Sequence, residues 1–205
     1  RSGSARHGLG TGHRRHSRRG AGIGGGPRGG ERSTQGQARS QGGVRRRAYA
    51  RRANRISVRN VHGVVVAIIE IVSPGNKDSK NAFESFVAKS VEFLQHGVNL
   101  LIVDPFPPTV RDPHGLHEAI WSEVTDEPFD ARPADKPLTV VSYHTWPDLT
   151  AYVDPIAVGD ELPEAPLFLA RDRHVNVPLE STYRTSWSVA PAAIRKAVES
   201  PLTSR

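Results

Sequence analysis

The sequence contains no cysteine, which excludes disulfide bonds, thiolate metal ligands and a cysteine nucleophile. Long apolar segments are missing too. The longest wholly apolar run, residues 64–69, is far shorter than the roughly 20 residues of a membrane-spanning helix. No apolar segment typical of a signal peptide occurs near the start. We therefore expect no membrane partner and a cytoplasmic location. Methionine is absent even at position 1, which suggests a processed chain, a fragment or an unusual start.

Acidic residues are nearly absent from residues 1–55, where Glu31 stands alone among 15 arginines and gives a net charge of +14. Residues 56–205 carry 13 basic and 20 acidic residues, a net charge of −7. Fourteen of the 19 glycines also precede residue 44. So polar a segment cannot bury enough apolar surface to offset its chain entropy. We predict that residues 1–54 form a disordered Arg/Gly-rich tail.

The tail could act electrostatically, because arginines bind phosphate backbones without sequence preference and with strong salt dependence. This hypothesis makes non-specific nucleic acid a possible partner. Its candidate binding residues are Arg14, Arg15, Arg18, Arg19, Arg45, Arg46 and Arg47. The alternative is a solvated extension or a segment that is not a natural part of the protein, since Tyr49 is its one aromatic residue. No Gly-Lys-Ser/Thr follows the glycines, so they do not form a phosphate-binding loop.

The remainder, residues 55–205, is predicted to be an α/β domain. β-branched or alternating apolar residues predict strands at residues 56–61, 64–72, 98–103, 138–143 and 151–158, the last interrupted by Pro155. Helical spacing predicts helices at residues 81–96, 114–123 and 179–198, the last with a break at Pro191. The proline-rich residues 162–178 are predicted to be extended and irregular. The second strand, the first helix and the third strand make a βαβ unit, so these two strands should be parallel.

Glu70 is the most informative residue, because it interrupts an otherwise apolar strand. A buried carboxylate must reach a cation, accept hydrogen bonds or take up a proton. Asp104 ends the parallel neighbour, at the edge where ligands gather in βαβ folds. In one hypothesis, Glu70 and Asp104 hold Mg²⁺ while Lys77 or Lys89 steadies the water or phosphate of a phosphodiesterase. In the other, Glu70 forms a buried ion pair with Lys77 or Lys89 that only fixes the fold.

Other candidate residues carry weaker signals. His114 and His117 are three residues apart beside Glu118, which is not the spacing of the His-Glu-x-x-His zinc motif. Ser73 has no histidine placed as its base, which argues against a serine hydrolase. The three tryptophans are predicted to be core or rim residues because no basic residues cluster around them in the sequence; they are Trp121, Trp146 and Trp187.

Several stretches resemble a bacterial family named domain of unknown function 4058. The first is Ile-Ile-Glu-Ile-Val-Ser-Pro-Gly-Asn-Lys at residues 68–77, and the second is Gly-Val-Asn-Leu-Leu-Ile-Val-Asp at residues 97–104. Residues 157–169 and 176–183 are similar to the family as well, in the same order. The resemblance runs from about residue 56 to residue 198. The family has no established biochemical role.

The order of these stretches is also similar, more loosely, to the Uma2-type branch of the PD-(D/E)XK nuclease-like fold. That resemblance implies a restriction-endonuclease-like mixed sheet, with an Asp on one strand and Glu-x-Lys on the next. Glu70 matches the Glu, but Val72 stands at the Lys position and no acidic residue lies between Glu31 and Glu70. The resemblance therefore implies a sheet that lacks its first elements and has an exposed edge. We expect a non-catalytic or degenerate domain, with a Mg²⁺-dependent nuclease as the alternative.

Overall fold

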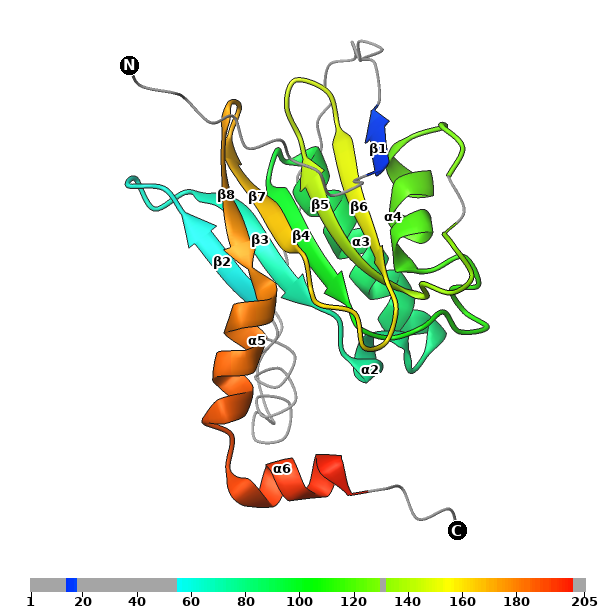
Figure 1. Cartoon of the computed structure of the whole chain (residues 1–205). Coiled ribbons are helices and arrows are strands. Elements are labelled where there is room, and N and C mark those ends of the chain that lie inside the picture. Colours follow the sequence, from blue (N-terminus) through cyan, green and yellow to red (C-terminus); the bar gives the residue numbers. More distant parts are fainter. Residues whose placement is uncertain (1–13, 18–54, 130–131, 201–205) are drawn as a thin grey trace, which may run out of the picture.

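The computed structural model describes residues 14–17, 55–129 and 132–200, and it places them in three layers (Figure 1). Two of the helices cover one face of a mixed sheet of six strands, and a two-stranded hairpin covers the other. The large sheet contains β1 (Arg14–Ser17), β2 (Arg55–Arg59), β3 (Val65–Ile71), β4 (Asn99–Asp104), β5 (Leu138–His144) and β6 (Thr150–Ile156). The hairpin is β7 (Glu164–Ala170) and β8 (Arg173–Pro178). The helices are α2 (Pro74–Lys77), α3 (Lys80–Gln95), α4 (Leu116–Val124), α5 (Leu179–Ser188) and α6 (Ala192–Glu199).

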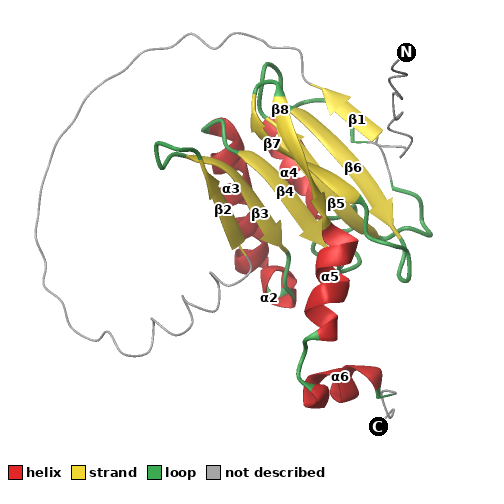
Figure 2. Ribbon diagram, turned by 60° about the vertical axis from the view of Figure 1, so that its left-hand side comes forward, coloured by secondary structure: helices red, strands yellow, loops and turns green. Residues whose placement is uncertain are grey.

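The strand order in the large sheet is β1-β6-β5-β4-β3-β2 (Figure 2). β3 and β4 are parallel, with Ile69 opposite Leu101, and the other neighbours are antiparallel. This pairing confirms the predicted βαβ unit, in which α3 makes the crossover. The mixed α/β class predicted from the sequence is therefore confirmed.

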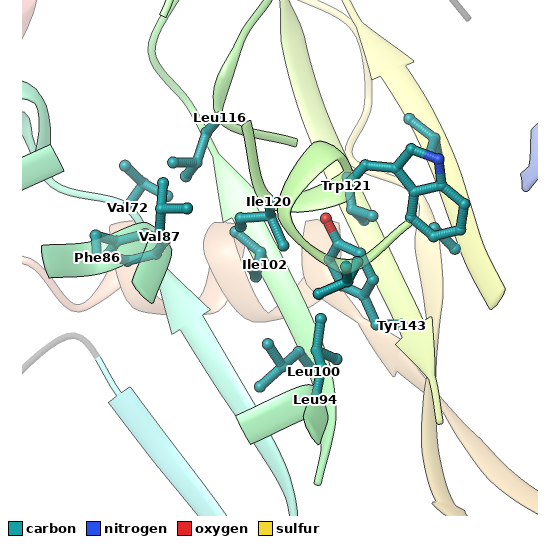
Figure 3. Packing of buried hydrophobic residues seen from close by; sticks show 14 of the residues in the cluster. Val72, Phe86, Val87, Leu94, Leu100, Ile102, Leu116, Ile120, Trp121 and Tyr143 are labelled. Carbon is teal, nitrogen blue, oxygen red and sulfur yellow. The ribbon is translucent and has the colours of Figure 1, made fainter. Parts of the chain in front are cut away.

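Two hydrophobic clusters lie on opposite faces of the sheet, because successive side chains of a strand alternate in direction. Figure 3 shows the cluster under the helices, where strand residues meet residues of α3 and α4. Its labelled members are Val72, Phe86, Val87, Leu94, Leu100, Ile102, Leu116, Ile120, Trp121 and Tyr143. The second cluster joins Ala67, Leu101, Val103, Val140 and Ile156 of the sheet to Ala165 and Leu167 of β7.

Local sequence determines both ends of the crossover helix. The Ser79 hydroxyl accepts a hydrogen bond of 3.2 Å from the backbone N–H of Ala82, which satisfies one free donor of the first turn. At the other end, Gly97 has a φ of +73°, a conformation that suits glycine because it has no Cβ. The chain then turns directly into β4.

The proline-rich segment at residues 162–178 was predicted to be extended and irregular; most of it is extended as predicted, but it is regular, so that part of the prediction is wrong. The segment forms the β7–β8 hairpin, in which Pro166 lies opposite Asn176. A two-stranded sheet consists of edge strands, where a missing N–H donor is tolerated. Pro155 likewise does not interrupt β6. β1 pairs with β6 only as far as Val153, so at Pro155 this side of β6 is again an edge.

Residues 14–17 fall within the segment 1–54 that is predicted to be a disordered tail, and the structure describes them as a strand. They form β1, which pairs antiparallel with β6 at the end of the large sheet. Their sequence, Arg-Arg-His-Ser, has no apolar alternation, and pairing of a strand edge depends on backbone groups that every residue supplies. Residues 1–13 and 18–54 lie outside the described part of the chain, so for them disorder stays a prediction.

The predicted helix at residues 179–198 consists of α5 and α6, separated around Pro191 as expected. Neither helix has a buried residue. In Figures 1 and 2 both extend from the end of β8, away from the sheets and from α3 and α4. We call residues 179–199 the helical arm. Across the described part of the chain, no helix combines the length and the apolar character needed to cross a membrane.

Candidate functional site at the ends of strands β3 and β4

A short helix positions Lys77 directly after β3. The side-chain oxygen of Asn76 accepts hydrogen bonds from the backbone N–H of Ser73, at 2.8 Å, and from its hydroxyl, at 2.7 Å. Pro74 occupies the first turn of α2, where no N–H is needed. This hydrogen-bonded turn places Lys77 against the end of β4, where its side chain is only 5% exposed.

A second turn, after β4, brings Asp112 to the same place. One carboxylate oxygen of Asp112 accepts hydrogen bonds from the backbone N–H of Thr109, at 2.8 Å, and from its hydroxyl, at 2.5 Å. Asp104, the last residue of β4, accepts a bond of 3.2 Å from the backbone N–H of Phe106. Both carboxylates are therefore held by the loop that follows β4.

Lys77 lies between these two carboxylates. Its Nζ is 2.7 Å from Oδ2 of Asp104, 2.8 Å from Oδ2 of Asp112 and 3.2 Å from the carbonyl oxygen of Phe106. An ammonium group has three N–H donors, and three oxygens surround this one. The guanidinium of Arg111 donates to the carbonyl oxygen of Lys77, at 3.3 Å. We call Lys77, Asp104 and Asp112 the lysine cluster; it joins the loops that follow β3 and β4.

The lysine cluster is buried, and burial has an electrostatic consequence. Desolvation raises the pKa of the Asp104 carboxyl above its ordinary value, although the hydrogen bond and the charge of Lys77 act in the opposite direction. The negative charge of Asp112 adds to the increase. Two carboxylates around one ammonium would leave a net negative charge in the interior, and a raised pKa reduces that cost.

Glu70 has a different cation from either one predicted. It lies opposite Arg55 in the β2–β3 pairing, and Nε of Arg55 donates to its Oε1 at 2.6 Å, with Nη2 also in contact. The guanidinium carbon lies 5.0 Å from the ring centre of Phe93 on α3, and burial lowers the pKa of Arg55. The expectation that a buried Glu70 must reach a cation or accept hydrogen bonds is confirmed. The partners predicted for it, Lys77 and Lys89, are wrong.

The sequence signal for Arg55 was its place on the preceding antiparallel strand, where it could lie directly opposite Glu70. The signal for Asp112 was weaker, since its position depends on the course of the loop after β4. Lys89 is exposed on α3, with its ammonium 5.8 Å from the ring centre of Phe93. It therefore lies on the helix, away from the lysine cluster.

The structure brings the two predicted metal ligands onto one face without joining them. Glu70 lies opposite Ile102, and Asp104 is two residues further along β4, so both side chains point towards the helices. Each carboxylate contacts its own cation: Arg55 for Glu70, Lys77 for Asp104. Within residues 55–129 and 132–200, no three His, Cys, Asp or Glu residues are grouped so that they could hold a metal ion.

Of the two weaker histidine candidates, His114 is exposed and His117 occupies a buried packing position. Nδ1 of His117 lies 2.5 Å from the hydroxyl of Tyr143, and its ring contacts Trp121 and Phe129. Complete burial raises the pKa of Tyr143 well above its ordinary value. Trp121 belongs to the core, as predicted.

Trp146 is a rim residue, as predicted, but a basic residue does accompany it. Its side chain is 41% exposed, and the guanidinium of Arg171 lies 4.3 Å from the centre of its ring. Nearby, His144 stacks on Phe168 with a ring separation of 4.3 Å. Sequence reasoning missed this contact because Arg171 comes from the β7–β8 turn, 25 residues away in the chain.

Most of the arginines proposed to bind nucleic acid cannot be placed. Arg18, Arg19, Arg45, Arg46 and Arg47 lie outside the described residues. Arg14 and Arg15 belong to β1, of which only the backbone pairing is described. Nucleic-acid binding by these residues stays a prediction.

Comparison of the chain with protein-family models, curated proteins and solved structures finds no match in any of the three.

Proposed function

We propose that this chain is a non-catalytic domain of nuclease-like α/β architecture that serves as a binding or structural module. One observation carries the proposal: each of the two carboxylates that could act as metal ligands, Glu70 and Asp104, is neutralised by a cation of the chain itself. A metal ion would have to displace Arg55 from one carboxylate and Lys77 from the other. Those cations instead stabilise the sheet edge and the loops.

The resemblance to the 4058 family and to the Uma2-type fold is part of this proposal. Its support is the order of strand, helix and parallel strand around Glu70. That resemblance expects an Asp on the strand before the Glu strand. Here the residue of β2 that faces Glu70 is Arg55, which has the opposite charge. A cation in this region favours a degenerate site over a working one.

The competing function is a Mg²⁺-dependent phosphodiesterase. It is favoured by the position of Glu70 and Asp104 on one face of adjacent parallel strands, near the edge where such folds bind ligands. Carboxylate oxygens are the ligands that Mg²⁺ prefers, and Lys77 would then contact the phosphate. Among the described residues, this function requires both ion pairs to open.

A cleavage assay distinguishes the two functions. The full chain is incubated with plasmid DNA or RNA in the presence of Mg²⁺ or Mn²⁺, beside Glu70→Ala and a control, Glu92→Ala, which changes an exposed carboxylate of α3. We expect no metal-dependent cleavage by any of the three. Cleavage that is lost in Glu70→Ala and retained in Glu92→Ala would contradict the proposal. Equal cleavage by all three would show that it does not come from the strand-end residues.

A further inference from the structure

Helix α6 has an apolar face that nothing in the described structure covers. Ile194 and Val198 are four residues apart, so they lie on one side of the helix, and they are 54% and 68% exposed. Ala197 adjoins them on one flank and Arg195 on the other. Arg195 is half-buried, and its Nε is a buried atom with no hydrogen-bond partner among the described residues. An exposed apolar stripe with a basic residue at its flank is typical of a helix that binds another surface.

A groove with complementary properties runs between α3 and α4. It has a volume of about 600 Å³, and its apolar lining includes Phe83, Val87 and Val91 of α3 and Ala119 of α4. Its charged lining residues are all acidic: Glu84, Glu118 and Glu123. Oε1 of Glu84 also lies 3.6 Å from Nζ of Lys80, but this exposed ion pair contributes little to stability. The groove therefore suits an apolar helix with basic residues at its sides.

We propose that α6 of one copy of this chain binds the α3–α4 groove of a second copy, and that the exchange is reciprocal. In this dimer Ile194 and Val198 contact the apolar floor, and Arg195 pairs with the acidic rim. With Lys196 and Glu199 counted as well, α6 has a net charge of +1. A two-fold arrangement uses both junctions at once, which matters because one helix of eight residues buries little surface on its own.

Anchoring of the arm explains why the partner is a second copy. The arm begins after β8, on the sheet face opposite α3 and α4. Its first turn is fixed there, because Leu179 packs in the second cluster and Glu180 accepts a 2.9 Å bond from the backbone N–H of Leu162. α5 has 10 residues and is about 15 Å long. Reaching the groove of its own chain would require α6 to pass around the sheet.

Two hydrogen bonds hold the Glu180 carboxylate at this anchor. The backbone N–H of Leu162 and the side chain of Arg184 lower the pKa of the Glu180 carboxyl. Glu180 is therefore ionised at neutral pH and accepts both hydrogen bonds as a carboxylate. This inference is independent of the proposed function, because neither the groove nor the arm contains a strand-end residue.

The test is the oligomeric state of the full chain, measured by sedimentation equilibrium over a wide concentration range. We expect a monomer–dimer equilibrium. The arm variant Ile194→Glu/Val198→Glu and the groove variant Glu118→Arg/Glu123→Arg should each raise the dissociation constant about tenfold or more. The matched control is Val158→Glu, which places a charge at an apolar residue that is 85% exposed and outside both surfaces. It should leave the equilibrium unchanged.

Mixing the arm variant with the groove variant gives the decisive measurement. An arm variant retains an intact groove and a groove variant retains an intact arm, so the mixture can form one normal junction. We expect heterodimers that are weaker than the wild-type dimer and stronger than either variant alone. A wild-type chain that stays monomeric, or an arm variant that dimerises as well as the wild type, would overturn the proposal. Binding of the arm or the tail within the same chain would give the first of these results.

Discussion

Two charged groups lie on the same face of the sheet, and their surroundings differ. In the lysine cluster, all three side chains are at most 5% exposed and come from the ends of β3 and β4 and the loops after them. In the other group, Glu70 is buried while Arg55 is 24% exposed, because β2 is the edge strand. A buried charge that loses its partner cannot reach water, whereas an edge residue can turn outward. We therefore expect the ion pairs of the lysine cluster and the Arg55–Glu70 pair to stabilise the fold by different amounts.

The largest effect is expected from Lys77→Met. This change leaves Asp104 and Asp112 buried without their cation, and loss of one partner from such a group costs about 3–5 kcal/mol. Urea unfolding at neutral pH measures the loss. A loss below about 1 kcal/mol, the usual range for exposed ion pairs, would show that the cluster does not hold the loops.

The pH dependence of the same variant sharpens this result. Without Lys77, nothing on that side chain offsets the desolvation that raises the pKa of Asp104, so this pKa should lie further above that of the unfolded chain. The deficit relative to the wild type should then shrink as the pH falls below neutral and grow as it rises. A deficit that stays constant with pH would indicate lost packing instead of lost charge.

Removing either partner of the Arg55–Glu70 pair should lower the free energy of unfolding by less than Lys77→Met does, and by unequal amounts. Arg55→Met leaves Glu70 buried and unpaired, and we expect a loss of about 2–3 kcal/mol. Glu70→Gln leaves Arg55 able to turn into solvent, and we expect about 1 kcal/mol. Chemical unfolding of the two variants in one buffer gives the comparison. Equal losses, or a larger loss for Glu70→Gln, would show that Arg55 on the edge strand does not gain access to solvent when Glu70 is neutralised.

The smallest effect is expected from Asp104→Asn, although Asp104 belongs to the buried cluster. Burial raises the pKa of Asp104, so at a pH between its unfolded and folded pKa values the folded chain keeps a proton that the unfolded chain releases. Its contribution to stability therefore falls as the pH rises from its ordinary pKa through the raised value. Asparagine is neutral at every pH, so the variant should lack this fall and differ from the wild type by less than about 1 kcal/mol at neutral pH. Thermal unfolding as a function of pH tests both points, and a loss as large as that of Lys77→Met would refute them.

Much of the fold could be predicted because local patterns determine it. The continuous apolar runs of β3 and β4, with an amphipathic helix between them, correspond to the observed parallel pair. The β7–β8 hairpin could not be predicted in the same way. Its prolines argue against a strand in general, and they are tolerated because no third strand of the described residues pairs with the hairpin. That information belongs to the tertiary structure.

The candidate site was predictable to a similar extent. The burial of Glu70 and its need for a cation followed from one acidic residue in an apolar strand. The identity of the cation depended on strand register, which brought Arg55 opposite Glu70. Lys77 was recognised as a strand-end residue, but its second partner, Asp112, reaches it through a loop of irregular course. Charge and burial could be predicted from local sequence, and pairing could not.

The most direct test of the central claim is a thermal-unfolding titration of the full chain with Mg²⁺ and Mn²⁺, in parallel with Glu70→Gln. If Arg55 and Lys77 neutralise both carboxylates, neither metal should raise the melting temperature of the wild type by more than it raises that of the variant. A metal-dependent rise in the wild type that is absent from Glu70→Gln would show a metal site at Glu70. That result would contradict the proposal of a non-catalytic domain.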